Sequence, residues 1–154
     1  TLGKQDALRE KVEKEVRRRL NGGKLPFTLE NIEKMAQRAR EKATEMGVPV
    51  VFAAVDDGGN LIMMQRMKDS FMGSIDVAIN KAFTANAFKM PTDVLGAAAQ
   101  PGQPLYGIET SNAGRIVLFG GGFPYEYEGR VVGAIGISGG SVEENIFHNA
   151  LLQM

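Results

Sequence analysis

The residues best suited to chemistry are two cationic side chains, one nearby carboxylate and two groups of glycines. Lys81 lies in an alanine-rich segment with helical periodicity. A lysine in such a helix either extends into solvent or forms the cationic rim of a pocket. In the second case Lys81 would face Asp76 or the carboxylate of a ligand. Arg115, which precedes an apolar run, is a second candidate for binding a ligand carboxylate.

The glycines supply candidate anion-binding backbone. Residues 120–122 can adopt left-handed torsions and present adjacent N–H groups to an anion. Residues 139–141 open the last helical segment, and the N-terminus of a helix favours negative charge. The candidate residues are Gly120, Gly121, Gly122, Gly139, Gly140 and Ser141. The alternative is that these residues form tight turns and closely packed contacts, and the sequence leaves both interpretations open.

Two further glycines, Gly133 and Gly136, lie three residues apart in an apolar run, so they face opposite sides of a strand. Glycine at such positions indicates that another backbone or a flat ligand approaches the strand closely. A dinucleotide-binding fingerprint does not fit, because its glycines lie in a turn and an acidic residue follows about 20 residues later. A P-loop does not fit either, since the sequence contains no Gly-Lys-Ser or Gly-Lys-Thr.

Few residues are suited to metal or acid–base chemistry. His148 is the only histidine and cysteine is absent, so no His/Cys cluster can form within one chain and no metal site is expected. Residues 56–60, Asp-Asp-Gly-Gly-Asn, have turn composition and lack the ligand spacing of a calcium-binding loop. In an enzyme, Lys81 would polarise a carboxylate or carbonyl metabolite, and Asp56 or Asp76 would move protons.

Apolar periodicity and turn residues define the elements that must position these groups. Helices are predicted over residues 5–20, 28–46, 74–90, a short segment ending at residue 99, and 141–154. Strands are predicted over residues 50–55, 61–67, 114–120 and 131–138. Lys81 is expected on the surface of its helix, whose predicted buried face consists of Ile75, Ala78, Ile79, Ala82 and Phe83. Because the strands group in hairpins, they predict an antiparallel sheet in an α+β domain.

The N-terminal segment stands apart from the rest of the chain. Residues 1–21 are predicted to form an amphipathic helix, residues 22–27 a linker, and residues 28–154 the main domain. Leu8, Val12, Val16 and Leu20 recur every four residues and form one narrow apolar stripe. This stripe is expected to pack on its own domain or a sister subunit, or to dock into a groove on another protein.

Charge and hydropathy limit the classes of partner that the chain can bind. The chain carries 18 basic and 18 acidic residues, but its first 24 residues hold eight of the basic and four of the acidic ones. The remainder is therefore acidic, which argues against a broad nucleic-acid surface. No apolar run approaches the roughly 20 residues that span a bilayer, and no secretory signal opens the chain. We therefore expect no membrane partner and a cytoplasmic location.

Several motifs together resemble the GlcG/HbpS family, also known as haem-degrading-like or PduO C-terminal domain-like proteins. They are "VPVVFAAVDDGGNLIMMQRM", "SIDVAINKAFTA", "QPGQPLYGI", "GRIVLFGGGFP" and "GRVVGAIGISGGSVEE", which run in order from about residue 28 to 145. The resemblance implies a PAS/profilin-like α+β fold with a five-stranded antiparallel sheet and helices on its faces. It also implies homo-oligomers, from dimers to octamers, and binding of haem or a cobalamin-like tetrapyrrole.

The resemblance also implies a setting, because PduO-type domains occur with propanediol-utilisation microcompartments. Segment 5–20 resembles the encapsulation helices of microcompartment cargo, which predicts a shell protein as partner and a location inside the compartment. The histidine axial ligand of the PduO-type arrangement has no counterpart between Thr28 and Met46. The main hypothesis is an accessory tetrapyrrole-binding domain. The alternatives are a small enzyme acting on a carboxylate or carbonyl metabolite, and a purely structural assembly module.

Overall fold

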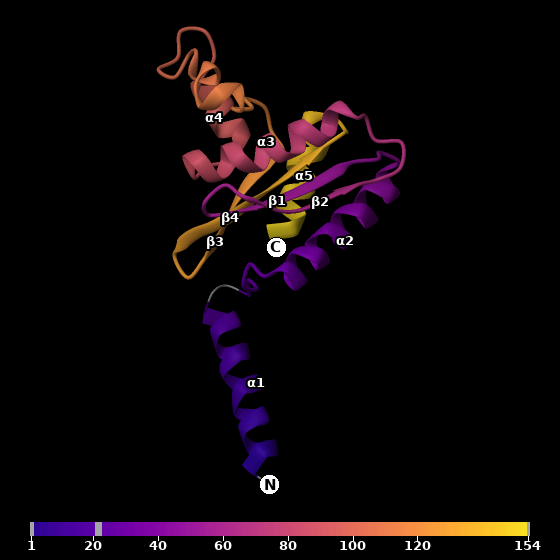
Figure 1. The fold of residues 1–154 in the computed structure, drawn as a ribbon, viewed down its shortest axis with the longest axis vertical. Helices are drawn as coiled ribbons and strands as arrows, with labels where there is room; N and C mark the ends of the chain where they lie inside the picture. Colours follow the sequence, from indigo (N-terminus) through magenta and orange to yellow (C-terminus); the bar gives the residue numbers. More distant parts are fainter. Residues whose placement is uncertain (1, 21–22, 154) are drawn as a thin grey trace.

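The computed structural model describes residues 2–20 and 23–153, which form helices around one sheet (Figure 1). The helices are α1 (Leu2–Leu20), α2 (Leu29–Met46), α3 (Gly73–Phe88), α4 (Thr92–Ala98) and α5 (Val142–Gln153). The strands are β1 (Val51–Asp56), β2 (Leu61–Arg66), β3 (Gly122–Tyr127) and β4 (Arg130–Ser138). Two short 3-10 turns, Ile108–Thr110 and Asn112–Gly114, interrupt the long connection between α4 and β3.

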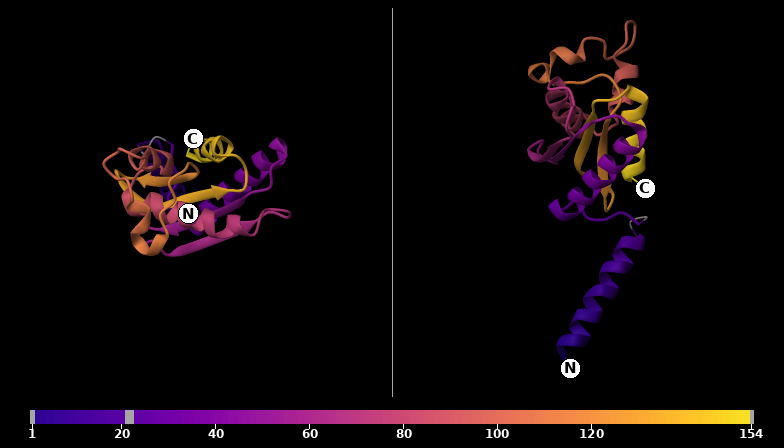
Figure 2. Two further views of the ribbon diagram at one scale, coloured as in Figure 1. Left: turned by 90° about the horizontal axis from the view of Figure 1, so that it is seen from above. Right: turned by 90° about the vertical axis from the view of Figure 1, so that its right-hand side faces the viewer.

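All strand pairs are antiparallel, in the order β2-β1-β4-β3, so the α+β prediction is confirmed. Figure 2 shows the sheet between α3 on one side and α5 with α2 on the other. Within the described ranges the sheet has four strands, so the prediction of five is wrong. The central pair, β1 and β4, aligns Val51 with Ser138 and Asp56 with Gly133.

The strand predicted over residues 114–120 is absent, and β3 instead occupies residues 122–127, where a connection was expected. The N–H of Val117 donates to Oγ1 of Thr84 on α3 at 3.0 Å, so this segment follows the helix rather than the sheet. β3 contains Pro124 and lies at the edge of the sheet, where a missing N–H is tolerated. The apolar pattern of residues 116–118 therefore reflects packing against helices.

Small residues let α3 lie unusually close to its face of the sheet. They are Ala53, Ala134 and Gly136 on the strands and Ala78, Ala82 and Ala85 on the helix. A Cβ at Gly136 would lie only 2.1 Å from the carbonyl oxygen of Ala78. A Cβ at Gly133 would lie 2.5 Å from the ring of Phe27, on the other face. The prediction of opposite faces is confirmed, and the closely approaching groups belong to the chain itself.

The opposite face carries the larger core, between the sheet and helices α2 and α5. Its residues include Ile32, Met35, Phe52, Ile135, Ile137 and Leu152. α2 begins and ends as predicted, because the Thr28 hydroxyl accepts from the N–H of Asn31 and Gly47 takes a left-handed φ of 71°. This core fixes the position of α5, whose first residues follow directly from the glycine-rich end of β4.

Residues 25–27 of the predicted linker are held against β3. The Tyr125 hydroxyl donates to the carbonyl of Leu25 at 2.6 Å, and the rings of Phe27 and Tyr125 stack with centroids 4.9 Å apart. Burial raises the pKa of Tyr125, in accord with a protonated donor. The chain is therefore anchored to the domain two residues after Gly23.

α1 extends away from the body of the protein (Figure 1), and it forms a helix over the described part of the predicted N-terminal segment. Its apolar stripe is exposed, by 63% at Leu8, 54% at Val12 and 50% at Val16. None of the helices described is both long enough and apolar enough to cross a bilayer. The stripe thus has no cover within the described chain.

Candidate functional site

Lys81 is fully buried, which corrects the expectation that it lies on the surface of its helix. Its Nζ donates to the carbonyl oxygen of Ile137 on β4 at 2.9 Å. The packed face of α3 is rotated relative to the predicted one, and Ile75, Ile79 and Phe83 are only partly buried. The reason is the close approach at Gly136, which turns the alanines and Lys81 toward the sheet.

The Lys81 amine lies beside an aromatic ring, a glycine and a carbonyl, and Asn145 lies next to the same glycine. Nζ lies 5.0 Å from the ring centroid of Phe119, which is 45% exposed. A Cβ at Gly121 would come within 2.5 Å of Nζ, so the glycine leaves the space that the amine fills. In the part of the chain that the structure describes, no carboxylate lies within ion-pair distance of this amine. Burial lowers the pKa of Lys81 to about 8.

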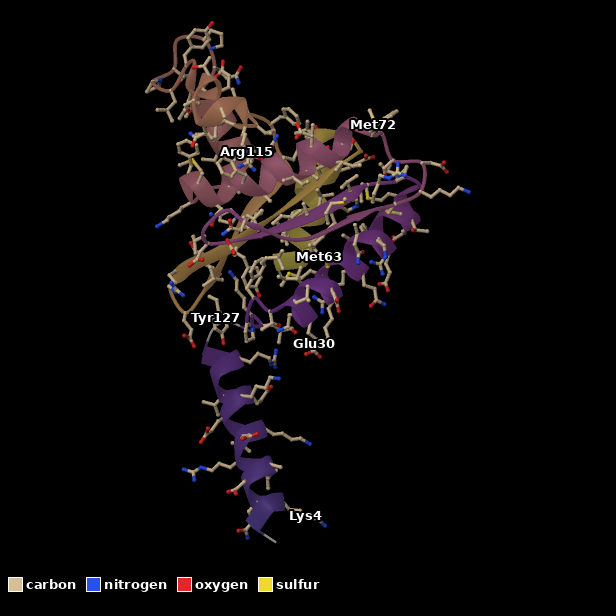
Figure 3. The ribbon with its side chains drawn as sticks, viewed as in Figure 1. Lys4, Glu30, Met63, Met72, Arg115 and Tyr127 are labelled. Carbon is tan, nitrogen blue, oxygen red and sulfur yellow. The ribbon has the colours of Figure 1, made fainter. Side chains whose placement is uncertain are left out.

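Asp76 and Arg115 come together on the outer side of α3, through Asn80. The Asn80 side-chain amide donates to the Asp76 carboxylate at 3.1 Å, and Nε of Arg115 donates to the Asn80 amide oxygen at 3.2 Å. The Arg115 guanidinium stacks on the ring of Phe83 at 3.7 Å. Figure 3 shows Arg115 beside α3, near α4. Lys81 points to the sheet instead, so the structure does not bring it to Asp76.

The glycine triplet lies on the buried side with Lys81. Gly120, Gly121 and Gly122 are all buried. The carbonyl of Gly121 accepts from the N–H of Ile137 at 2.9 Å, and the N–H of Gly122 donates to Oγ1 of Thr92 at 2.9 Å. Gly122 is required by packing, since its Cβ would lie 2.4 Å from the carbonyl oxygen of Lys81. The triplet thus joins α3, α4 and β4 around the buried amine.

Gly139, Gly140 and Ser141 form a separate group at the start of α5. The N–H of Ser141 donates to the Glu144 carboxylate at 3.0 Å, and the N–H of Glu144 donates to the Ser141 hydroxyl at 3.2 Å. This is the capping box that the sequence predicts. A Cβ at Gly139 would lie 2.6 Å from the carbonyl oxygen of Pro49. The chain's own carboxylate therefore occupies this helix N-terminus.

The two remaining polar candidates also have structural surroundings. Asp56 Oδ1 accepts from the N–H groups of Gly58 and Asn60, both at 2.9 Å, and these bonds lower the pKa of its carboxyl. His148 is fully buried on the α2–α5 face, and neither ring nitrogen has a hydrogen-bond partner among the described residues. Burial lowers the pKa of His148. In the described ranges, no group of three His, Cys, Asp or Glu residues could hold a metal ion.

Phe119 and Thr84 also belong to this site, although neither was predicted from the sequence. Thr84 follows Lys81 by three residues and therefore shares its helix face. Its hydroxyl accepts from the N–H of Val117 and donates to the carbonyl of Arg115 at 3.3 Å. Phe119 directly precedes the glycine triplet, and this position in the sequence could have indicated that it belongs to the site. We define Lys81, Phe119, Gly121 and Thr84 as the α3 site, with Arg115 at its outer edge.

This α+β domain, with its buried amine and glycine-lined strands, belongs to a known family. Residues 27–146 match the family described as haem degrading protein HbpS-like, so the chain is a member of it. This agrees with the resemblance found in the sequence.

Several relatives show how far the similarity reaches. The chain is 50% identical over 119 residues to a 15.0 kDa protein from the dhaT-dhaS intergenic region of Citrobacter freundii, covering 77% of this chain and 84% of that protein. It is 38% identical over 120 residues to the corrinoid adenosyltransferase PduO of Salmonella typhimurium, covering 78% of this chain. The match spans only 36% of that enzyme, so its activity is not implied for this chain.

Solved structures are similar over most of the chain. The Klebsiella pneumoniae protein ORFY superposes with a TM-score of 0.80 at 42% identity, covering 82% of this chain and 88% of that one. A PduOC:heme complex superposes with a TM-score of 0.80 at 36% identity, covering 84% of this chain and 94% of that one.

Proposed function

We propose that this protein is an accessory domain that binds a tetrapyrrole, haem or a corrinoid-like ring, within a homo-oligomer. The observation that carries the proposal is the similarity to the PduOC:heme complex over 94% of that chain, together with membership of the HbpS-like family. The adenosyltransferase similarity supports a corrinoid as the alternative ring. No catalytic step is included in the proposal.

The outer edge of the α3 site fits the carboxylates and the face of such a ring. Arg115 offers a planar set of donors, and only its Nε has a hydrogen-bond partner among the described residues. Phe119, four residues further along the chain, is half exposed and offers an aromatic surface. The faces of Gly133 and Gly136 do not fit a ring, because Phe27 and α3 already fill them. We therefore assign the ring to the surface of residues 115–119.

Histidine ligation of a haem iron does not fit this chain. His148 is buried on the opposite face of the sheet, and it is the only histidine. The residues at the proposed surface would hold a ring by charge and aromatic contact, and the protein supplies no imidazole there. Haemin binding is therefore expected to shift the Soret band without the spectrum of a histidine-ligated iron.

The test is a spectroscopic titration of the purified protein with haemin and with cobalamin. Arg115→Gln is expected to weaken binding about tenfold or more, because it removes a charge-assisted hydrogen bond. Arg130→Gln is the matched control, since Arg130 is an exposed arginine at the β3–β4 turn. Flat titrations with both ligands, or equal affinities for the two variants, would refute the proposed site.

The oligomer is assigned to exposed apolar surface at the start of α3. Phe71 and Met72 are 76% and 81% exposed, and Figure 3 shows Met72 at the end of α3 away from Arg115. Large exposed apolar side chains that adjoin each other are typical of subunit contacts. Light scattering is expected to show a dimer or a larger assembly that Phe71→Glu dissociates. A monomer in both proteins would contradict self-association.

We assign residues 1–21 to docking, residues 22–27 to a connection and residues 28–154 to the ligand-binding domain. The exposed stripe of Leu8, Val12 and Val16 supports contact with a shell protein and a location inside a microcompartment. Val12→Asp is expected to abolish co-purification with shells, because it places a charge on the stripe. Lys11→Gln, on the same helix but outside the stripe, is the control. Equal amounts of the two variants co-purifying with shells would contradict this assignment.

A further inference from the structure

The Lys81 amine has the surroundings of a reactive amine rather than of a structural cation. It is fully buried, it donates to one carbonyl, and no described carboxylate pairs with it. An ammonium that is buried without a counter-charge is unfavourable, so the neutral amine is stabilised relative to the charged one. A neutral amine carries a lone pair on nitrogen and is a nucleophile. At pH 7 an appreciable fraction of Lys81 is in this form, because its pKa is about 8.

The ring of Phe119, which lies over this amine, is partly exposed to solvent. The ring centroid is 5.0 Å from Nζ and the side chain is 45% exposed. The backbone on both sides is anchored, because the Gly121 carbonyl accepts from Ile137 and the Leu118 carbonyl is packed against Gly96. Rotation of one half-exposed side chain is a fast, local motion. Movement of the Phe119 side chain would therefore give a small molecule access to the amine.

We propose that the Lys81 amine forms a reversible imine with small aldehydes. The nitrogen lone pair adds to the carbonyl carbon, and a proton moves from nitrogen to oxygen to give a carbinolamine. Loss of the hydroxyl as water, with the second proton from nitrogen, gives the C=N bond. Amine and aldehyde thus yield imine and water, and addition of water reverses the reaction. No oxidant or cofactor is required.

The geometry favours an aldehyde over other electrophiles. The bond from Nζ to Ile137 O fixes one N–H toward the sheet, and the rest of the nitrogen faces Gly121 and Phe119, with Asn145 Cβ also beside Gly121. Gly121 contributes no side chain there, so a carbonyl carbon with one hydrogen and a short chain is the best fit. This activity goes beyond ring binding and needs no tetrapyrrole.

The test is reductive trapping on the protein without added haemin or cobalamin. The protein is incubated at pH 7 with propionaldehyde and cyanoborohydride, and peptide mapping measures propylation at each lysine. Lys89, exposed at the C-terminal end of the same helix, is the internal control. Lys81 is expected to react at least about tenfold faster than Lys89, because an amine with a pKa near 8 is far more often neutral at pH 7 than an ordinary lysine.

Two variants test the route and the residue. Phe119→Ala removes the covering ring and is expected to speed propylation of Lys81 several-fold while leaving Lys89 unchanged. Lys81→Met removes the proposed site of reaction. If this variant fails to fold, the propylation rates of Lys81 and Lys89 in Phe119→Ala still test the inference. Propylation of Lys81 no faster than that of Lys89 in both the parent protein and Phe119→Ala would overturn the inference. Such a result would leave ring binding intact, since that is tested separately with Arg115→Gln.

Discussion

In the part of the chain that the structure describes, each face of the central sheet buries one basic side chain, and the two differ in their contacts. Lys81, on the α3 face, donates to Ile137 O and lies beneath the half-exposed ring of Phe119. His148, on the α2–α5 face, has no hydrogen-bond partner for either nitrogen among the described residues. Burial lowers the pKa of both.

The difference shows that burial of a base does not by itself mark a functional site. The α3 face is made mostly of small residues, and their close packing brings Lys81 to the backbone of β4, where Nζ donates to Ile137 O. The α2–α5 face carries the larger apolar side chains of the core, and His148 is fully buried on this side. A directed hydrogen bond and the half-exposed ring of Phe119 distinguish Lys81 from His148.

The largest effect is expected from closing the narrow gap on the α3 face. Gly136→Ala places a methyl group against the Ala78 carbonyl, which is backbone and cannot move independently. We expect the free energy of unfolding to fall by about 3 kcal/mol, measured by urea denaturation. Gly73→Ala is the control, because a Cβ there would meet nothing within 4 Å. A variant as stable as the parent would show that α3 does not need this close approach.

Lys81→Met is expected to stabilise the protein at pH 7, by about 2 kcal/mol. The folded-state pKa of about 8 lies below the ordinary 10.5, so the unfolded state binds the proton more tightly. The resulting destabilisation of the parent protein is complete below pH 8 and disappears as the pH rises to 10.5. The variant avoids this destabilisation, but it loses the hydrogen bond to Ile137, which offsets part of the gain in stability. Urea midpoints between pH 7 and 10.5 should rise for the parent relative to the variant. Parallel curves would contradict a charged, buried lysine.

His148→Leu is expected to have the smallest effect, about 1 kcal/mol, confined to acidic solution. The folded-state pKa is lowered, mainly by burial, while Glu144 raises it and Lys42 lowers it further. The unfolded state therefore takes up a proton first as the pH falls below about 6.5, and the parent loses stability there. Thermal unfolding should show that the variant loses less stability than the parent between pH 7.5 and 5. Equal losses would show that His148 does not titrate differently on unfolding.

The sequence predicted most elements that depend on local signals. The capping of α2 by Thr28, its end at Gly47 and the Ser141–Glu144 capping box are properties of a few neighbouring residues, and all are present. The β1–β2 hairpin likewise follows from its turn residues, whose Asp56 carboxylate accepts two backbone N–H groups. Such features depend on local residues and not on tertiary packing, so the sequence alone predicts them.

The errors arose where tertiary contacts override local pattern. Residues 114–120 have strand composition, but Thr84 captures the N–H of Val117 and ties the segment to α3. The face of α3 was misjudged because close approach at Gly136 rotates the helix, and hydrophobicity alone favoured Ile75 and Ile79. The buried position of Lys81 could not be predicted without knowing that rotation. The binding of a ligand by the proposed anion-binding residues stays a prediction, which the titrations described above would test.

The anchoring of residues 25–27 by Tyr125 has a topological consequence. Lys24, Leu25 and Leu152 line one hollow, so the beginning and the end of the folded domain meet at one side, where Figure 1 also shows the C-terminus. A short peptide between these ends would close the backbone into a ring without disturbing the sheet. New termini could then be cut at the exposed β1–β2 turn, giving a circular permutant, or the domain could be spliced as a unit into a surface loop of a host protein.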